Sequence, residues 1–112
     1  MVNILGTNYT IIFESEDKDT RLKDNWGFTD FYTKEIFIRK DIDQETENSC
    51  KNLIYFKNKV LRHEIIHAFL YESGLNENSK SSMSWAENEE MVDWFAIQYP
   101  KLKAIFKKLN IE

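Results

Sequence analysis

The pattern of apolar and polar positions predicts strands in the first forty residues and helices after them. Residues 9–13 are β-branched and aromatic, which is typical of a strand. Two further strands are expected at 26–32 and 35–40, and the short polar link between them predicts an antiparallel hairpin. In the last of these, Ile36 and Ile38 point one way while their neighbours point the other. One face of this strand should therefore meet a core.

A long helix is expected over residues 50–73. Asn48 or Ser49 offers an N-cap, and Gly74 is a natural C-terminal stop. Residues 60–70 are apolar on several sides, as expected of a helix packed between other elements.

A second helix should begin near Trp85, because Ser84 followed by Glu87 is a capping-box signature. It should end around Tyr99, since Pro100 cannot continue the hydrogen-bond ladder but can open a new helix. A short C-terminal helix would then gather four apolar residues on one side: Leu102, Ile105, Phe106 and Leu109. The expected fold class is α+β, with a small antiparallel sheet of about three strands followed by three helices.

Composition places the chain among ordered globular proteins, with 42% hydrophobic residues, and residues 1–112 are expected to form a single domain. The net charge of −4 gives no reason to expect a nucleic-acid partner, and the C-terminal lysines are interpreted as a solvated helix face. Cys50 is the only cysteine, so an intrachain disulfide is excluded. No signal peptide or membrane span is visible, and a cytoplasmic protein is expected.

The strongest chemical signal is the pattern H-E-x-x-H at residues 63–67, which contains both histidines of the chain. On a helix, His63 and His67 lie one turn apart on the same face and can bind one metal ion together. Glu64 lies beside them and is suited to take the proton of an attacking water. Two solvated histidines on a surface helix are the simpler alternative, but the apolar flanks argue against it.

Catalytic zinc takes three protein ligands, so a third must come from a carboxylate or from Cys50. Cys50 precedes the motif by almost four helical turns, which would hold it about 20 Å away along the axis. At about 100° per residue, Glu89 lies at the edge of the buried stripe of the second helix, while Glu87 and Glu90 turn away from it. Glu89 is therefore the predicted ligand, with Glu90 as its main rival.

Asp93 lies one turn beyond Glu89 on nearly the same line. There it could accept the free ring N–H of a ligating histidine and fix its tautomer. An ordinary acidic first turn, stabilised by the helix dipole, would explain Glu87 and Glu90 but not an inward pair of Glu89 and Asp93.

Together, H-E-I-I-H and the later segment N-E-E-M-V-D at residues 88–93 resemble the gluzincin metallopeptidases, whose second helix reads N-E-x-x-x-D. The size and element order resemble the ImmA/IrrE family of metallo-endopeptidases, whose compact members are often encoded by phages and prophages. The resemblance covers about residues 26–99 and implies a minimal zincin-like fold. It implies one Zn²⁺ per chain at His63, His67 and Glu89, with Glu64 as general base and Asp93 behind a histidine.

Larger gluzincins add a His or Tyr that stabilises the oxyanion, and this chain has no third histidine. Tyr71, one turn past His67, is the catalytic candidate for that role, and Tyr32 and Arg39 are alternatives. At helical spacing, Tyr71 is more often a packing residue.

The expected function is a zinc-dependent metallo-endopeptidase that hydrolyses a protein or peptide substrate, by resemblance a regulatory protein such as a repressor. An extended substrate would add alongside an exposed strand of the hairpin. The alternative is a catalytically inactive zinc-binding protein that acts as a phage or host protein-interaction module, since small domains often depend on a metal for stability. A metal-free scaffold with a coincidental motif is a third interpretation. The sequence does not specify an oligomeric state.

Overall fold

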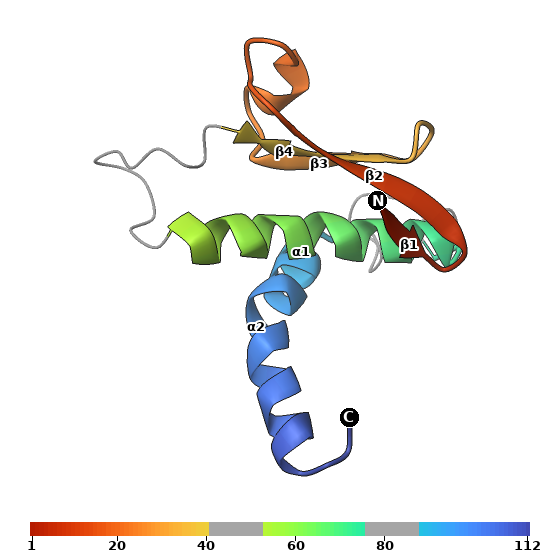
Figure 1. Ribbon diagram of the computed structural model, residues 1–112, viewed down its shortest axis with the longest axis vertical. Helices are drawn as coiled ribbons and strands as arrows, with labels where there is room; N and C mark the ends of the chain where they lie inside the picture. The colour runs from red at the N-terminus through yellow and green to blue at the C-terminus, as the bar shows by residue number, and fades with distance from the viewer. Residues whose placement is uncertain (41–52, 76–87) are drawn as a thin grey trace.

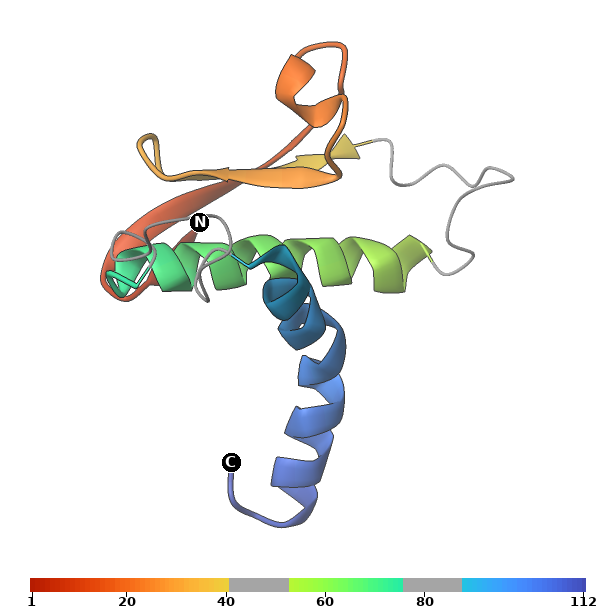
Figure 2. The same ribbon diagram turned by 180° about the vertical axis from the view of Figure 1, so that it is seen from behind.

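The computed structural model describes residues 1–40, 53–75 and 88–112 and has an α+β fold (Figure 1). Four strands, one 3-10 turn and two helices occur in these ranges: β1 (Val2–Ile4), β2 (Thr7–Glu14), η1 (Thr20–Leu22), β3 (Gly27–Asp30), β4 (Glu35–Arg39), α1 (Leu53–Glu72) and α2 (Glu89–Lys108). Figure 2 shows the same layers from behind: α1 lies between the sheet and the projecting part of α2. Neither helix is both long and apolar enough to cross a membrane.

The sheet has the strand order β1-β2-β4-β3. The predicted hairpin is confirmed, because β3 and β4 pair antiparallel. The expectation of an antiparallel sheet was wrong, since β2 pairs parallel with β4. After β2 the chain passes through η1 and reverses into β3 at the outer edge, so that β4 returns in the direction of β2.

The first strand, β1, escaped prediction. It pairs antiparallel with β2 across a two-residue turn at Leu5 and Gly6, whose φ angles are 50° and 94°. Positive φ at both central residues is the type I′ hairpin geometry, which usually carries Asn-Gly or Asp-Gly. Leu5 stands where Asn or Asp is usual, so the sequence does not indicate this turn.

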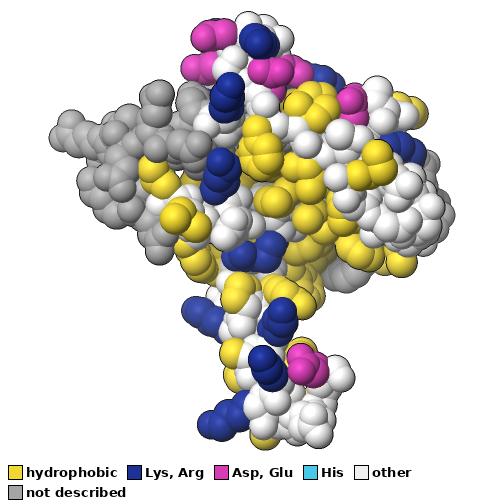
Figure 3. All heavy atoms as spheres, in the orientation of Figure 1, with side chains coloured by type: hydrophobic (Ala, Val, Ile, Leu, Met, Phe, Trp, Pro, Cys, Tyr) yellow, Lys and Arg dark blue, Asp and Glu magenta, His cyan; other side chains and the backbone are white. Residues whose placement is uncertain are grey.

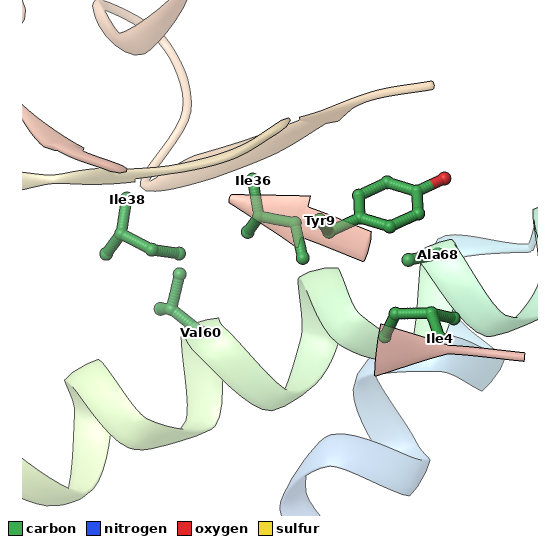
Figure 4. Close-up of a cluster of buried hydrophobic side chains, with 6 residues drawn as sticks. All are labelled: Ile4, Tyr9, Ile36, Ile38, Val60 and Ala68. Carbon is green, nitrogen blue, oxygen red and sulfur yellow. The ribbon is translucent and has the colours of Figure 1, made fainter. Parts of the chain in front are cut away.

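The hydrophobic core lies between one face of the sheet and α1 (Figure 4). Ile36 and Ile38 of β4 are fully buried there, as their alternation predicted, and they face the part of α1 that carries Val60. The core also contains Ile4, Tyr9 and Ala68. Small residues such as Ala68 on the helix let it approach the strands closely.

The opposite face of the sheet is covered by a smaller arrangement around η1. Phe28 and Phe37 are directly opposite in the β3–β4 ladder, and their rings stack with centroids 4.7 Å apart. Arg21 of η1 lies 4.2 Å above the Phe28 ring and donates to Asp19 and Asp30. This cover keeps β3 in place at the sheet edge.

The end of α1 is tied to the sheet through the carboxylate of Glu72. It accepts hydrogen bonds from Thr7 (2.9 Å), Tyr9 (2.7 Å) and Lys34 (2.9 Å). These bonds lower the pKa of Glu72, while burial and the bond to Glu72 raise the pKa of Tyr9. Gly74 follows the helix with φ of 87°, as predicted for its stop. The predicted N-terminal region of this helix, with Asn48 and Ser49, lies outside the described residues.

The second helix begins at Glu89, and its N-cap is Asn88, whose side-chain oxygen accepts from Met91 N at 2.8 Å. The prediction of a start near Trp85 was therefore misplaced for this helix, because the capping role belongs to Asn88. The proposed capping box of Ser84 and Glu87 lies outside the described residues.

The prediction that Pro100 ends one helix and opens another was wrong, because α2 continues through Pro100 to Lys108. Proline leaves the carbonyl four residues earlier without its N–H donor. That carbonyl belongs to Ala96, and it accepts instead from Arg62 Nε of α1 at 2.7 Å. A side chain of α1 thus supplies the hydrogen bond that Pro100 cannot donate. The sequence around Pro100 does not reveal this contact.

This contact leads to a prediction for stability. Arg62→Met should lower the free energy of unfolding by about 1 kcal/mol, because Ala96 O loses its donor. In a Pro100→Ala background the helix supplies its own N–H, and the same change should cost less. Urea denaturation of the four proteins gives the coupling free energy. An equal cost of Arg62→Met in both backgrounds would mean that Arg62 acts only through its packing.

Candidate metal centre

The side chains of the H-E-x-x-H motif lie on the face of α1 that meets β3 and the start of α2. His63 and His67 are one turn apart, and their Nε2 atoms are 3.1 Å from each other. Glu89 Oε2, from the first residue of α2, lies 2.9 Å from His63 Nε2 and 3.2 Å from His67 Nε2. Three ligand atoms from two helices therefore converge on one point.

These distances suit a small divalent cation. In a tetrahedral zinc site with bonds of about 2.0–2.1 Å, two ligand atoms are roughly 3.3 Å apart. Two imidazoles and one carboxylate are also the donor set of several catalytic zinc sites. Within residues 1–40, 53–75 and 88–112, His63, His67 and Glu89 form the one group of three side chains that could bind a metal ion. These residues fit the predicted ion.

Glu89 reaches the histidines because Asn88 caps α2 and sets the direction of its first turn. The hydrogen bonds to His63 and His67 lower the pKa of Glu89, so that it is a carboxylate at neutral pH. Glu89 is exposed rather than facing inward as predicted, and Glu90, the rival candidate, is exposed too. Glu90 lines a different hollow, together with Met91 and Trp94. The structure brings Glu89 to the histidines and not Glu90. Glu87 and Cys50 lie outside the described residues.

Asp93 lies behind His63, with its Oδ1 atom 3.1 Å from His63 Nδ1. A proton on Nδ1 would bond to Asp93 and leave the Nε2 lone pair directed at the site. Burial lowers the pKa of His63, but the bonds to Glu89 and Asp93 outweigh it and the pKa is raised. Burial raises the pKa of Asp93, whereas its bonds to Lys59 and His63 outweigh that effect and lower it.

The contact of Lys59 with Asp93 was not predicted from the sequence. Its Nζ atom lies 3.1 Å from Asp93 Oδ1, the same oxygen that faces His63. Lys59 precedes His63 by one helical turn, so it shares the face of the motif, and that spacing is the signal that could have found it. The lysine holds Asp93 as a carboxylate and fixes its position.

Glu64 is almost completely buried, with 6% of its surface exposed. Thr29 Oγ1 of β3 lies 2.9 Å from Glu64 Oε1 and 3.1 Å from the Glu64 carbonyl oxygen. Burial raises the pKa of Glu64, and the nearby histidines oppose this only in part. Glu64 therefore has the higher proton affinity expected of a general base.

Gly27 allows β3 to lie directly against Glu64. A Cβ atom at this position would be 2.9 Å from Phe37 O and 3.2 Å from Glu64 Cγ. Gly27 and Thr29 are two residues apart on one strand and so share the face that meets α1. Both residues were missed by the sequence analysis, although their spacing places them together once the strand is known.

A cavity of about 700 Å³ opens beside these groups. It is lined by the segment from Asn25 to Thr29, by Phe31, and by the α1 and α2 residues of the centre: Lys59, Val60, His63, Glu64, His67, Glu89 and Asp93. Within the part of the chain that the structure describes, β3 pairs with β4 alone, so it is an edge strand bordering the cavity.

The predicted oxyanion residues lie elsewhere. The Tyr71 ring stacks on Phe31 with centroids 4.3 Å apart, and Tyr71 is not among the residues that line the cavity. Tyr32 is exposed in the turn after β3, and Arg39 lies over Trp26. None of these three side chains is therefore among the described residues that line the cavity beside the histidines.

Comparison of the chain with protein-family models, curated proteins and solved structures finds no match.

Proposed function

We propose that this protein is a zinc-dependent metallopeptidase. The observation that carries the proposal is the convergence of two histidine nitrogens and one carboxylate oxygen within 3.2 Å of one another, beside the buried carboxylate of Glu64. A site that only stabilises the fold needs the three ligands. It has no use for the additional buried carboxylate of Glu64, which directly follows His63 in the sequence.

His63, His67 and Glu89 would hold the zinc ion, which would supply a Lewis acid for activating water and polarising a carbonyl group. Glu64 accepts the proton of the attacking water and delivers it to the departing amine. Thr29 holds one oxygen of Glu64, which fixes the rotamer of the base. Asp93 and Lys59 together hold the His63 ring in the orientation that aims Nε2 at the ion.

The substrate of this reaction is an extended segment of a protein or peptide. The edge strand β3 borders the cavity and offers backbone N–H and C=O groups to such a segment. The convergence of the H-E-x-x-H histidines with Glu89 of the next helix supports a minimal gluzincin resembling the ImmA/IrrE family, and a regulatory protein as target is proposed from that resemblance. Phage or prophage origin and a cytoplasmic setting belong to the same proposal.

One observation favours a second candidate, a non-catalytic zinc protein that binds another protein. No tyrosine or arginine is among the residues that line the cavity in the described ranges. The additional His or Tyr that larger gluzincins direct at the oxyanion is thus not among these lining residues. In this second candidate a fourth group closes the coordination sphere of the metal.

The two candidates differ in whether the bound metal keeps an open coordination position. The visible absorption spectrum of bound Co²⁺ distinguishes the two cases. The metal-free protein, titrated with Co²⁺, should bind one equivalent, and its visible absorption should change when acetohydroxamate is added. The same titration of Glu90→Ala should give the same spectra, because Glu90 lies outside the centre. A Co²⁺ spectrum that does not respond to acetohydroxamate would contradict the peptidase proposal and support the structural site.

A further inference from the structure

A second apolar face runs along α2 and has no partner in the described part of the chain. Only the first half of the helix is anchored, through Val92 and Ala96, which are fully buried. Every residue from 103 to 112 is exposed. Figure 1 shows this half of α2 projecting away from α1, and Figure 3 shows apolar side chains among lysine side chains along it.

The apolar face has a heptad spacing. Its positions follow one another at intervals of four, three, four, three and four residues, which is the a/d pattern of a coiled coil. Five of them are apolar, Met91, Phe95, Leu102, Ile105 and the C-cap residue Leu109, and the sixth is the polar Gln98; these six residues are called the seam below. At about 100° per residue, the seam is centred about 100° around the helix from Val92 and about 140° from Ala96. It is therefore a surface separate from the contact with α1.

The seam is broad enough to bury another helix. Phe95 is 40% exposed, Ile105 is 54% exposed and Leu109 is 59% exposed. Tyr99 and Phe106, 50% and 42% exposed, widen it on one side. At roughly 200 Å² for each large side chain, these residues and Trp94 leave on the order of 600 Å² of mainly apolar surface open. A stable interface needs about 800 Å² per partner, so the helix alone supplies most of one.

We propose that the seam binds the seam of a second copy of this chain, with the two α2 helices antiparallel. The spacing is self-complementary in that orientation. Met91 lies opposite Leu109 of the second copy, Phe95 opposite its Ile105, and Gln98 opposite its Leu102, and each layer occurs twice about a two-fold axis near Pro100. A closed two-fold pair of this kind buries the seam of both copies and leaves no part of it exposed for further association. The proposal does not depend on the function of the metal centre.

One charge that flanks the seam fits this orientation. Glu89 and Asp93 face His63 and Lys59 on the other side of α2, whereas Glu90 lies outside the metal centre. In an antiparallel pair Lys108 of the second copy lies near Glu90, and in a parallel pair it would lie at the level of Lys108 instead.

A hollow in the surface lies at the end of the seam. Its volume is about 450 Å³, and it is lined by Asn88, Glu90, Met91 and Trp94. The antiparallel register places Leu109 of the second copy against Met91, at this hollow. The same register brings its Lys108 toward Glu90 and the Trp94 ring, where a lysine is favourable.

The mass in solution tests the proposal. Sedimentation velocity of the wild type should give a species of twice the 13.4 kDa chain mass. Leu102→Glu, at a central layer of the seam, should give the monomer. Ala104→Glu is the matched control, because Ala104 is exposed on the other side of the helix and its substitution should leave the dimer intact. A wild type that stays monomeric at every concentration overturns the proposal, as does a Leu102→Glu protein that stays dimeric while folded by circular dichroism.

The orientation is tested with cysteines in a Cys50→Ser background. Gln98→Cys and Leu102→Cys proteins are prepared separately and oxidised alone or mixed. An antiparallel pair forms the covalent dimer mainly in the mixture, because positions 98 and 102 lie opposite each other. Efficient cross-linking of Leu102→Cys with itself would indicate a parallel pair and overturn the proposed register.

A lysine-flanked apolar helix can also lie on an anionic membrane surface. Flotation with phosphatidylglycerol vesicles separates that outcome from a dimer. The dimer buries the seam, so the wild type should stay with the soluble fraction. A monomeric wild type that floats with the vesicles would assign the seam to a membrane and overturn the pairing.

Discussion

Glu64→Gln is expected to retain one zinc per chain and to cleave a peptide roughly 10²–10⁴-fold more slowly than the wild type. The amide has nearly the same shape as the carboxylate, and its oxygen can still accept from Thr29, which lies 2.9 Å from Glu64 Oε1. It cannot take up the proton of the attacking water. Zinc content by elemental analysis and cleavage of a fluorescently labelled, unfolded protein measure the two effects on the same samples.

Glu90→Gln is the matched control for this experiment, because it makes the same chemical change at an exposed position outside the cavity. Its cleavage rate should equal that of the wild type. Thermal unfolding of each variant shows whether the buried amide has weakened the fold. Cleavage by a folded, zinc-loaded Glu64→Gln protein at the wild-type rate would exclude Glu64 as the base.

The main parts of the centre follow from helical periodicity in the sequence. A spacing of four residues fixes His63 and His67 on one face wherever the helix lies, and the same geometry separates Glu89 from Glu90. These are local relations, which depend only on the helix being formed. Contacts between two different elements cannot be derived from helical periodicity alone. The contact of Thr29 with Glu64 and the close approach at Gly27 require the sheet to be placed against α1 first.

The errors in the predicted fold have the same origin. Pro100 was expected to end a helix because its missing N–H is a local defect, but Arg62 from another helix supplies the donor. The parallel pairing of β2 with β4 depends on where the chain passes after β2, which the strand pattern does not encode. By contrast, the β3–β4 hairpin joins neighbouring segments through a short turn, and its antiparallel pairing was confirmed.

Glu89→Ala is expected to lose most of the bound zinc, whereas Glu90→Ala should retain about one ion per chain. Loss of groups that only support a ligand already lowers metal affinity by about 10–100-fold, so removal of a ligand should exceed that. Both variants remove one carboxylate from the first turn of α2, so their effects through the helix dipole are alike. The comparison therefore isolates coordination, and competition with a chelator of known affinity measures it.

The converse result would change the geometry of the centre. Zinc lost from Glu90→Ala but kept in Glu89→Ala would require α2 to rotate by about 100°, the angle between successive helical residues. Asp93 would then turn away from His63, and Val92 and Ala96 would leave the contact with α1. Zinc retained equally in both variants would leave the two histidines as the binding pair, with Glu89 contributing only its charge. Because the burial of Val92 and Ala96 fixes the rotation of α2, we expect the loss in Glu89→Ala alone.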